Sequence, residues 1–289
     1  MSRQRVTVVE VGPRDGLQNE AAILPVDTKV AFVDALSAAG LPVIEATAFV
    51  SPKAIPQLAD GEDVFRRIAK RPGVRYPVLV PNEKGLDRAL AAGVREIAVF
   101  TAASETFNRR NINASIDESF ARFAPVLARA EAAGMRVRGY VSCAFGCPYE
   151  GPVAPEAVAR VASRLVEIGC AEVSVGDTIG IGVPTQVPEV VGRTVEAGVP
   201  IERLALHFHD TRGTALANVA EGLRAGVRIF DSSAGGLGGC PYAPGAAGNV
   251  ATEDLLGLLH GSGYETGVDL SAVAGASRVM AAAIRLRPV

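Results

Sequence analysis

Two histidines that lie two residues apart are the residues of this chain best suited to chemistry. The chain has 289 residues and only three histidines, and two of these are His207 and His209, at the end of an apolar run. Side chains at positions i and i+2 of a strand point to the same face. Because histidine is the commonest protein ligand of metals, the pair predicts a metal site. A hydrogen-bonded pair beside a polar loop is the alternative interpretation.

Asp15 and Asn249 are candidate partners for the two histidines, since each follows a predicted strand. Two imidazoles, a carboxylate and an amide oxygen suit a divalent ion with open coordination positions. Open positions allow a substrate to chelate the ion and be polarised, whereas a closed structural zinc site would use cysteines. Asp-Gly and Gly-Asn are also common in turns, so the ligand interpretation depends on all four residues meeting at one site.

A glycine-rich segment, residues 235–245, carries Cys240. Many glycines cost conformational entropy, and a loop that bears this cost is often one that closes over a ligand. The thiol is therefore predicted to serve acid/base or nucleophilic chemistry, with an incidental thiol in a flexible loop as the alternative. The other cysteines are expected to be structural: Cys143 and Cys147 pack at a strand end, and Cys170 lies in the core.

One pattern repeats along the chain: a helical segment ends in small residues and a glycine, and an apolar strand follows within a few residues. Glycine accepts the left-handed conformation that ends many helices. By capping chemistry, Ser115 and Thr252 are expected to begin helices. Strands are predicted near residues 6–11, 43–48, 76–80, 96–100, 137–143, 172–177, 204–209 and 228–232. Helices are predicted near residues 27–39, 57–70, 83–92, 115–133, 155–168, 185–197, 214–225, 252–261 and 270–286.

Eight β–α units without a linker indicate a (β/α)8 TIM barrel with an extra C-terminal helix, forming a single catalytic domain over residues 1–289. A doubly wound open sheet is less favoured, because no Gly-x-Gly-x-x-Gly follows the first strand. Barrel chemistry takes place where the strands end, so the polar residues there are expected to form one site. These residues are Glu10, Arg14, Asp15, Glu45, Asp177, Thr178, His207, His209, Asp210 and Asp231.

The composition argues against several classes of partner. The net charge is −2 and the isoelectric point is about 6.0, which is no electrostatic footprint for nucleic acid or an anionic membrane. No signal peptide, import leader or membrane-spanning apolar stretch is evident, so a soluble, cytoplasmic protein is expected. Residues 108–111, Asn-Arg-Arg-Asn, could hold an anionic tail such as phosphates or form a solvated loop.

These segments closely resemble the hydroxymethylglutaryl-CoA lyase family, part of a metal-dependent barrel superfamily that also contains isopropylmalate and homocitrate synthases. The resemblance runs from Val9 to about Leu270. Arg-Asp after the first strand and His-x-His in the seventh are shared across the superfamily, whereas the loop with Cys240 is specific to the lyases. The matching segments are residues 9–20, 49–53, 138–143, 176–180, 207–211, 236–243 and 248–254.

The resemblance implies cleavage of 3-hydroxy-3-methylglutaryl-CoA to acetyl-CoA and acetoacetate, in leucine catabolism or ketone-body formation. It implies that Mg²⁺ or Mn²⁺ is the cofactor and that the enzyme forms a homodimer. By the same resemblance, Arg14 stabilises the enolate oxygen of the leaving acetyl-CoA and Cys240 transfers a proton. The remaining implied residues are Asp15, His207, His209 and Asn249 as metal ligands, Glu45 and Asp177 as supporting acidic residues, and Gln18 and Thr178 as substrate contacts beside Arg14.

Three positions depart from the family pattern. Ala46 and Ala48 replace hydroxyl residues expected around Thr47, and Arg212 stands where an aromatic residue is expected. If these changes alter the pocket, the substrate could be a 3-hydroxyglutaryl-CoA with a longer 3-substituent. A Claisen-condensing synthase is less favoured because it predicts no Cys240 loop, and a metal-binding barrel without catalysis is least favoured because all the implied catalytic residues are present.

Overall fold

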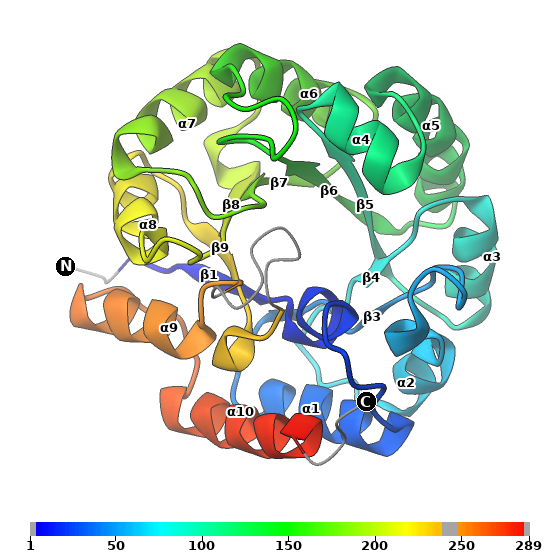
Figure 1. Cartoon of the computed structure of the whole chain (residues 1–289). Coiled ribbons are helices and arrows are strands. Elements are labelled where there is room, and N and C mark those ends of the chain that lie inside the picture. The colour runs from blue at the N-terminus through cyan, green and yellow to red at the C-terminus, as the bar shows by residue number, and fades with distance from the viewer. Residues whose placement is uncertain (1–3, 239–247, 286–289) are drawn as a thin grey trace.

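The computed structural model describes residues 4–238 and 248–285, and its strands form a single parallel sheet that curls into a barrel (Figure 1). The strand order is β2-β1-β9-β8-β7-β6-β5-β4-β3. The strands are β1 (Thr7–Glu10), β2 (Val43–Ile44), β3 (Thr47–Ala48), β4 (Val78–Leu79), β5 (Glu96–Ala102), β6 (Arg136–Ser142), β7 (Glu172–Asp177), β8 (Leu204–Phe208) and β9 (Ile229–Ser232).

The two edges of this sheet are successive pieces of one segment, residues 43–48, which was predicted as a single strand. β2 pairs with β1, and β3 pairs with β4. Between them, the Glu45 amide donates to the Glu10 carbonyl at 2.8 Å and the Ala46 amide donates to the Pro77 carbonyl at 3.0 Å. The segment therefore joins both neighbours. The (β/α)8 barrel is confirmed, with its second strand divided in the middle.

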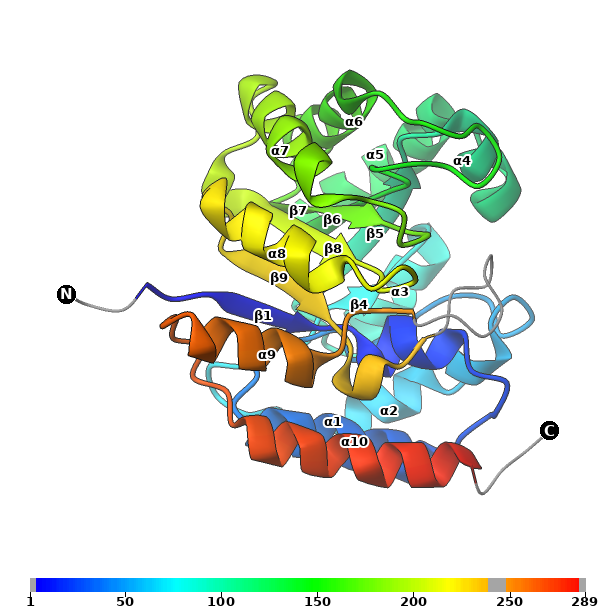
Figure 2. The same ribbon diagram turned by 60° about the vertical axis from the view of Figure 1, so that its left-hand side comes forward.

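Helices surround the sheet on its outer side (Figures 1 and 2). The final helix, α10, lies beside α1 and is the extra C-terminal helix that the sequence predicted. In the described part of the chain, no helix is both long and apolar enough to cross a membrane. The helices are α1 (Val26–Ala38), α2 (Gly61–Arg67), α3 (Glu83–Ala91), α4 (Glu105–Ile112), α5 (Ile116–Ala132), α6 (Pro155–Glu167), α7 (Val187–Glu196), α8 (Ala215–Arg224), α9 (Thr252–Gly261) and α10 (Leu270–Arg285).

The expected helix ends are mostly confirmed. Every glycine predicted to end a helix has a positive φ, between 66° and 104°: these are Gly40, Gly93, Gly134, Gly169, Gly198 and Gly226. Ser115 caps α5 in a reciprocal pair of hydrogen bonds with Glu118. Helix α9 begins at Thr252 as predicted, but Thr252 does not cap it, because Ala251 occupies the cap and the Thr252 hydroxyl donates to Glu10 at 2.7 Å.

Helix α4 contains the segment 108–111 whose structure the sequence left open. The Ser104 hydroxyl begins this helix by accepting the Phe107 amide at 3.1 Å. The Asn108 side chain is buried and donates to the carbonyls of Ala114 and Ser115. Asn108 is therefore a structural residue, and the solvated-loop interpretation of this segment is wrong.

Charged residues occupy much of the barrel interior, where apolar layers are usual. Arg138 has no exposed surface, and Asp231 and Glu172 are almost completely buried. The main apolar core lies between the sheet and the helices, and Val8, Ile44 and Val137 are examples of its strand residues. Because successive strand residues point to opposite faces, apolar positions such as Val8 and Val137 face the helices while these charged positions face inward. The interior also holds a smaller apolar cluster of Val9, Val11 and Val43.

Substitution of two glycines separates the effect of a strained backbone from the effect of a crowded side chain. Gly40 has φ +90° and a Cβ there would lie 2.5 Å from the Gly267 carbonyl oxygen, whereas Gly169 has φ +104° and free space around it. We expect Gly169→Ala to lower the free energy of unfolding by about 1–2 kcal/mol through the left-handed backbone alone. Gly40→Ala is expected to cost about 1–3 kcal/mol more through overpacking. Urea denaturation of the two variants checks this, and equal losses would contradict the contact with Gly267.

Candidate active site

The predicted metal ligands meet at the C-terminal end of the barrel. Asp15 lies in the π-helical turn Gly12–Gly16 that follows β1, His207 lies in β8, and His209 follows it. One ligand atom from each of these residues lies within 4.8 Å of the other two. Asn249 joins the group, because its Nδ2 donates to Asp15 Oδ2 at 3.0 Å and its backbone bridges to His209.

Three buried atoms of this group lack a hydrogen-bond partner among the described residues: Asn249 Oδ1, His209 Nδ1 and His207 Nδ1. Of these, His207 Nδ1 lies 3.3 Å from a carboxylate oxygen of Asp231. Buried polar atoms in proteins nearly always have partners. A set of oxygen and nitrogen donors without sulfur also matches the preference of a hard or borderline divalent cation. The residues present therefore fit a divalent ion.

A buried carboxylate supports His207 from behind. Asp231 Oδ2 lies 3.3 Å from His207 Nδ1 and accepts the Ser174 hydroxyl at 2.8 Å, while Oδ1 accepts from Arg138 Nη2 at 2.6 Å. A carboxylate on the second nitrogen of a ligand histidine fixes the tautomer and the ring orientation. Sequence reasoning placed Asp231 at a strand end but did not give it this role. The register of β8 against β9, which sets His207 opposite Asp231, is the missing signal.

Electrostatics hold Asp15 and His209 in the protonation states that bind metals. Burial raises the pKa of Asp15, but Arg14 and the two histidines outweigh it and lower that pKa to about 2. Burial and the neighbouring His207 lower the pKa of His209 to about 4. For His207, burial lowers the pKa but Asp231 outweighs it, so the net shift is upward. At neutral pH, Asp15 is thus an anion and His209 is a neutral donor.

Arg14 is held between two carboxylates beside this cluster. Its Nη1 lies 2.7 Å from Asp15 Oδ1 and its Nη2 lies 2.8 Å from Glu45 Oε2. The Tyr140 hydroxyl also donates to Glu45 Oε2, at 3.0 Å, and the Arg14 guanidinium lies 5.5 Å from the centre of the Tyr140 ring. Burial opposes the charge of Arg14, but Glu45 and Asp15 outweigh it and raise its pKa. The geometry fixes a permanent cation next to the metal ligands.

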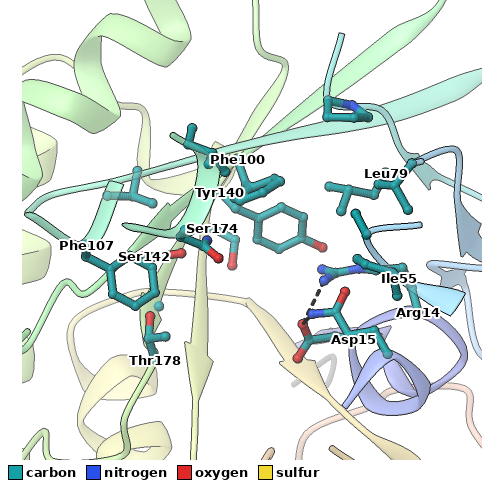
Figure 3. Close-up of a pocket in the computed structure, with 18 of the residues that line it drawn as sticks. Arg14, Asp15, Ile55, Leu79, Phe100, Phe107, Tyr140, Ser142, Ser174 and Thr178 are labelled. Atoms are coloured by element: carbon teal, nitrogen blue, oxygen red, sulfur yellow. Dashed lines mark hydrogen bonds and ion pairs between the residues drawn. The ribbon is translucent and has the colours of Figure 1, made fainter. Parts of the chain in front are cut away.

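A cavity of about 740 Å³ opens above these residues. Figure 3 shows Arg14 and Asp15 on one side of it and Phe107 and Thr178 on the other, with the Tyr140 ring between them. The predicted substrate contacts Gln18 and Thr178 both line the cavity. The remaining lining residues include the apolar side chains Ile55, Leu79, Phe100 and Phe107 and the polar side chains Asn111, Arg122, Ser142 and Ser174.

The predicted site residue Asp177 is not among the described residues that line the cavity, and another predicted residue lies outside the described part of the chain. Asp177 is fully buried, and its carboxylate accepts the backbone amides of Ile181 at 3.1 Å and Gly182 at 2.8 Å. It shapes the loop after β7, and within the described chain the cavity is lined by its neighbours Gly176 and Thr178 instead. Cys240 lies outside the described residues, so its predicted part in proton transfer stays a prediction.

The concern about Ala46 and Ala48 is not supported. Both are buried in the main hydrophobic core, and neither is among the described residues that line the cavity. The Thr47 side chain between them packs against Gly61 at the start of α2. The cysteines behave as expected: Cys143 and Cys147 pack with Ala102 and Phe107 at the end of β6, and Cys170 is in the core.

Glu10 ends β1 but belongs to the supports of the site. Its Oε1 accepts the amides of Gly12 at 2.8 Å and Ala234 at 2.9 Å, and its Oε2 accepts the Thr252 hydroxyl. Glu10 thereby joins the turn that carries Asp15 to the loop that follows β9. Burial raises its pKa to about 7, although these hydrogen bonds oppose the shift.

A parallel (β/α)8 barrel with a carboxylate–histidine cluster and a buried arginine at the C-terminal ends of its strands is the arrangement of a metal-dependent barrel enzyme. The chain belongs to the HMGL-like family, whose model matches residues 5–280. It is 59% identical over 271 residues to the hydroxymethylglutaryl-CoA lyase of Pseudomonas mevalonii, an alignment that covers 94% of this chain and 90% of that protein.

Solved structures agree with this family assignment. The hydroxymethylglutaryl-CoA lyase of Pseudomonas aeruginosa superposes with a TM-score of 0.95 at 54% identity, over 97% of this chain and 93% of that one. An HMG-CoA lyase of Acinetobacter baumannii, solved in complex with coenzyme A and 3-methylmalate, has a TM-score of 0.92 at 40% identity, over 97% and 92% of the two chains.

The raised pKa of Glu10 predicts a pH-dependent loss of stability. Below about pH 4.5 the carboxyl is neutral in both the folded and the unfolded state. Above about pH 7 the folded chain must hold a buried carboxylate, which disfavours it by about 3 kcal/mol for a pKa near 7 against 4.5. The free energy of unfolding, relative to that of Glu10→Gln, should therefore fall between pH 4.5 and 7 and then level off. Urea denaturation across this range checks it, and parallel pH profiles would contradict it.

Proposed function

We propose that this protein is a divalent-metal-dependent hydroxymethylglutaryl-CoA lyase, which cleaves 3-hydroxy-3-methylglutaryl-CoA to acetyl-CoA and acetoacetate. The observation that carries the proposal is the cluster of Asp15, His207 and His209 beside the buried Arg14 on the floor of a ligand-sized cavity. Membership of the HMGL-like family and 59% identity to a protein named as this lyase support it. The substrate class is accordingly an acyl-CoA.

The reaction breaks the C2–C3 bond of the substrate. The 3-hydroxyl loses its proton, C3 becomes the ketone of acetoacetate, and the electron pair of the broken bond passes to C2 as the enolate of acetyl-CoA. Asp15, His207, His209 and Asn249 are the residues that would hold Mg²⁺ or Mn²⁺. When bound, such an ion lowers the pKa of the hydroxyl and orients the substrate.

Arg14 stabilises the charge that develops on the thioester oxygen. Its guanidinium is held by Asp15 and Glu45 before substrate arrives, so no reorganisation is needed as the enolate forms. A preorganised donor of this kind is worth roughly 3–4 kcal/mol. Cys240 supplies the proton that C2 needs to become the methyl group of acetyl-CoA, a step typically worth about 10²–10⁴ in rate.

The other predicted residues have supporting parts in this proposal. Glu45 positions Arg14, and Asp177 positions the loop that presents Thr178 to the cavity. Gln18 donates to Asp15 at 3.2 Å and lines the cavity, so it can orient a bound substrate. The cavity volume lies within the range of about 300–1,000 Å³ that is common for small-molecule sites.

Ala46, Ala48 and Arg212 are not among the described residues that line the cavity. The three departures therefore give no structural reason for a longer 3-substituent, and the methyl-substituted substrate is the one we propose. The synthase alternative is disfavoured by the lyase relatives at high identity. We further propose that residues 1–289 act as one catalytic domain, that the enzyme is a cytoplasmic homodimer, and that it serves leucine catabolism or ketone-body formation. Cell fractionation and sedimentation test the location and the dimer.

The first test is the release of acetoacetate from 3-hydroxy-3-methylglutaryl-CoA. Protein supplied with Mg²⁺ or Mn²⁺ should release it, because the ligand cluster needs an ion to activate the hydroxyl, and EDTA should abolish the release. Cys240→Ser should lower kcat about 10²–10⁴-fold through the loss of proton transfer. Absence of release by folded, metal-loaded protein would overturn the proposal, and 3-alkyl analogues with longer chains would be assayed next.

Arg14 gives a separate test of charge stabilisation. We expect Arg14→Gln to lower kcat about 10²–10³-fold, the cost of removing one preorganised donor to a developing oxyanion. Arg164→Gln is the control, since that guanidinium pairs with Asp117 on the surface at 2.7 Å. Steady-state kinetics of both variants check the expectation. A change confined to KM would show that Arg14 binds substrate without stabilising the transition state.

A further inference from the structure

A continuous series of buried charges runs through the barrel interior from the N-terminal ends of the strands to the metal ligands. Glu172, the first residue of β7, lies 2.7 Å from Arg138 Nε in β6. Arg138 Nη2 lies 2.6 Å from Asp231 in β9, and Asp231 lies 3.3 Å from His207. We call Glu172, Arg138, Asp231 and His207 the charge column.

The strand registers keep the charge column in line. Arg138 faces Glu172 across β6 and β7, and His207 faces Asp231 across β8 and β9. Arg138 has no exposed surface, Asp231 is 2% exposed and Glu172 is 2% exposed. Charges in such a place are strongly coupled, because little water is present to screen them.

Three groups contact Arg138, each at a different nitrogen of its planar guanidinium. Glu172 contacts Nε, the Tyr140 hydroxyl accepts from Nη1 at 2.7 Å, and Asp231 accepts from Nη2. Only two of the three are carboxylates, and they lie at the two ends of the guanidinium. If the Glu172 charge is lost, Asp231 is the carboxylate that remains in direct contact with the guanidinium among the described residues, and the optimal position of Asp231 relative to His207 changes.

We propose that Glu172 is a positioning residue for the metal site. Acting through Arg138 and Asp231, it fixes the orientation of the His207 imidazole and so raises the affinity for the divalent ion. This inference rests on the metal site of the proposed function. Within residues 4–238 and 248–285, Glu172 approaches that site only through Arg138, so its effect must be transmitted along the charge column.

Glu96 provides a matched control in the same part of the barrel. It is 4% exposed, and it pairs with Arg75 at 2.8 Å and Arg136 at 3.5 Å, the two arginines that also lie near Glu172. Its ion pairs do not include Arg138. Glu96→Gln therefore removes a buried carboxylate from the same arginine cluster and leaves every ion pair of the charge column in place. The Glu96 charge acts on Arg138 and Glu172 only through space.

The experiment measures the dissociation constant of Mn²⁺ by electron paramagnetic resonance, together with the imidazole ¹⁵N resonances of His207 in metal-free protein. Glu172→Gln is expected to weaken Mn²⁺ binding about 10-fold, the lower end of the range of about 10–100-fold for outer partners of metal ligands. It should also shift the His207 resonances. Glu96→Gln should leave the dissociation constant within about 2-fold of wild type and the resonances in place.

A double-mutant cycle tests the route of transmission. If Glu172 acts through Asp231, then adding Glu172→Gln to Asp231→Asn should weaken Mn²⁺ binding by less than about 2-fold beyond Asp231→Asn alone. Glu172→Asp keeps the charge on a shorter side chain and should restore much of the lost affinity. Glu172→Asp is also the test variant if thermal denaturation shows that Glu172→Gln is unfolded. It is expected to bind Mn²⁺ about 2–5-fold more weakly than wild type, a loss smaller than that expected for Glu172→Gln.

Equal Mn²⁺ affinities of wild type, Glu172→Gln and Glu96→Gln would overturn the inference, as would losses that are additive with Asp231→Asn. If Glu172→Gln is unfolded, an unchanged affinity in Glu172→Asp would overturn it. These outcomes are distinct from failure of the proposed function, because they require wild-type protein that binds Mn²⁺. Wild-type protein that binds no Mn²⁺ would overturn both the metal site and the inference.

Discussion

The need to balance a fully buried guanidinium explains much of the arrangement inside this barrel. Arg138 has no exposed surface, and an unpaired charge in such a place would cost several kcal/mol. The cation is therefore balanced by Glu172 on one side and Asp231 on the other. Because Asp231 also supports His207, one requirement of the fold, neutralising Arg138, is met by the same carboxylate that prepares a metal ligand.

Arg14 is balanced in the same way, closer to the C-terminal ends of the strands. It too is buried, and it too lies between two carboxylates, Asp15 and Glu45. Tyr140 connects the two layers, since its hydroxyl accepts from Arg138 and donates to Glu45 while both guanidinium groups lie against its ring. The site is thus the upper end of an interior of ion-paired side chains, and its charges are positioned by the strands before any ligand binds.

The elements whose signals are local could be predicted from the sequence. Glycine at helix ends has a backbone cause, so the glycine-terminated ends of the predicted helices and the order of the strands were correct. The helix predicted for residues 57–70 is shorter, Gly61–Arg67, and α4 was not predicted. The metal cluster was also predictable, because Asp15 and the histidines follow apolar runs that must end at the same side of a parallel barrel.

The features that escaped prediction depend on register and on contacts between distant segments. Thr252 has the residue type of a helix cap, but Glu10 competes for its hydroxyl. Helix α4 has few apolar residues and is held by the Asn108 amide in a way that no periodicity reveals. The support of His207 by Asp231 depends on which residues face each other across β8 and β9, and a single sequence does not give that alignment.

The divided second strand has a consequence for how this protein resists opening. β2 and β3 contribute two residues each, and β4 also has two. The barrel is therefore closed by the pairing of its shortest strands. Glu45 lies between β2 and β3 and forms an ion pair with Arg14, which belongs to the turn after β1. The ion pair therefore links the turn after β1 to the divided second strand, where the strands are shortest. A ligand that binds only while this ion pair is formed would make transient opening of the barrel rarer, since binding to the closed form alone stabilises that form.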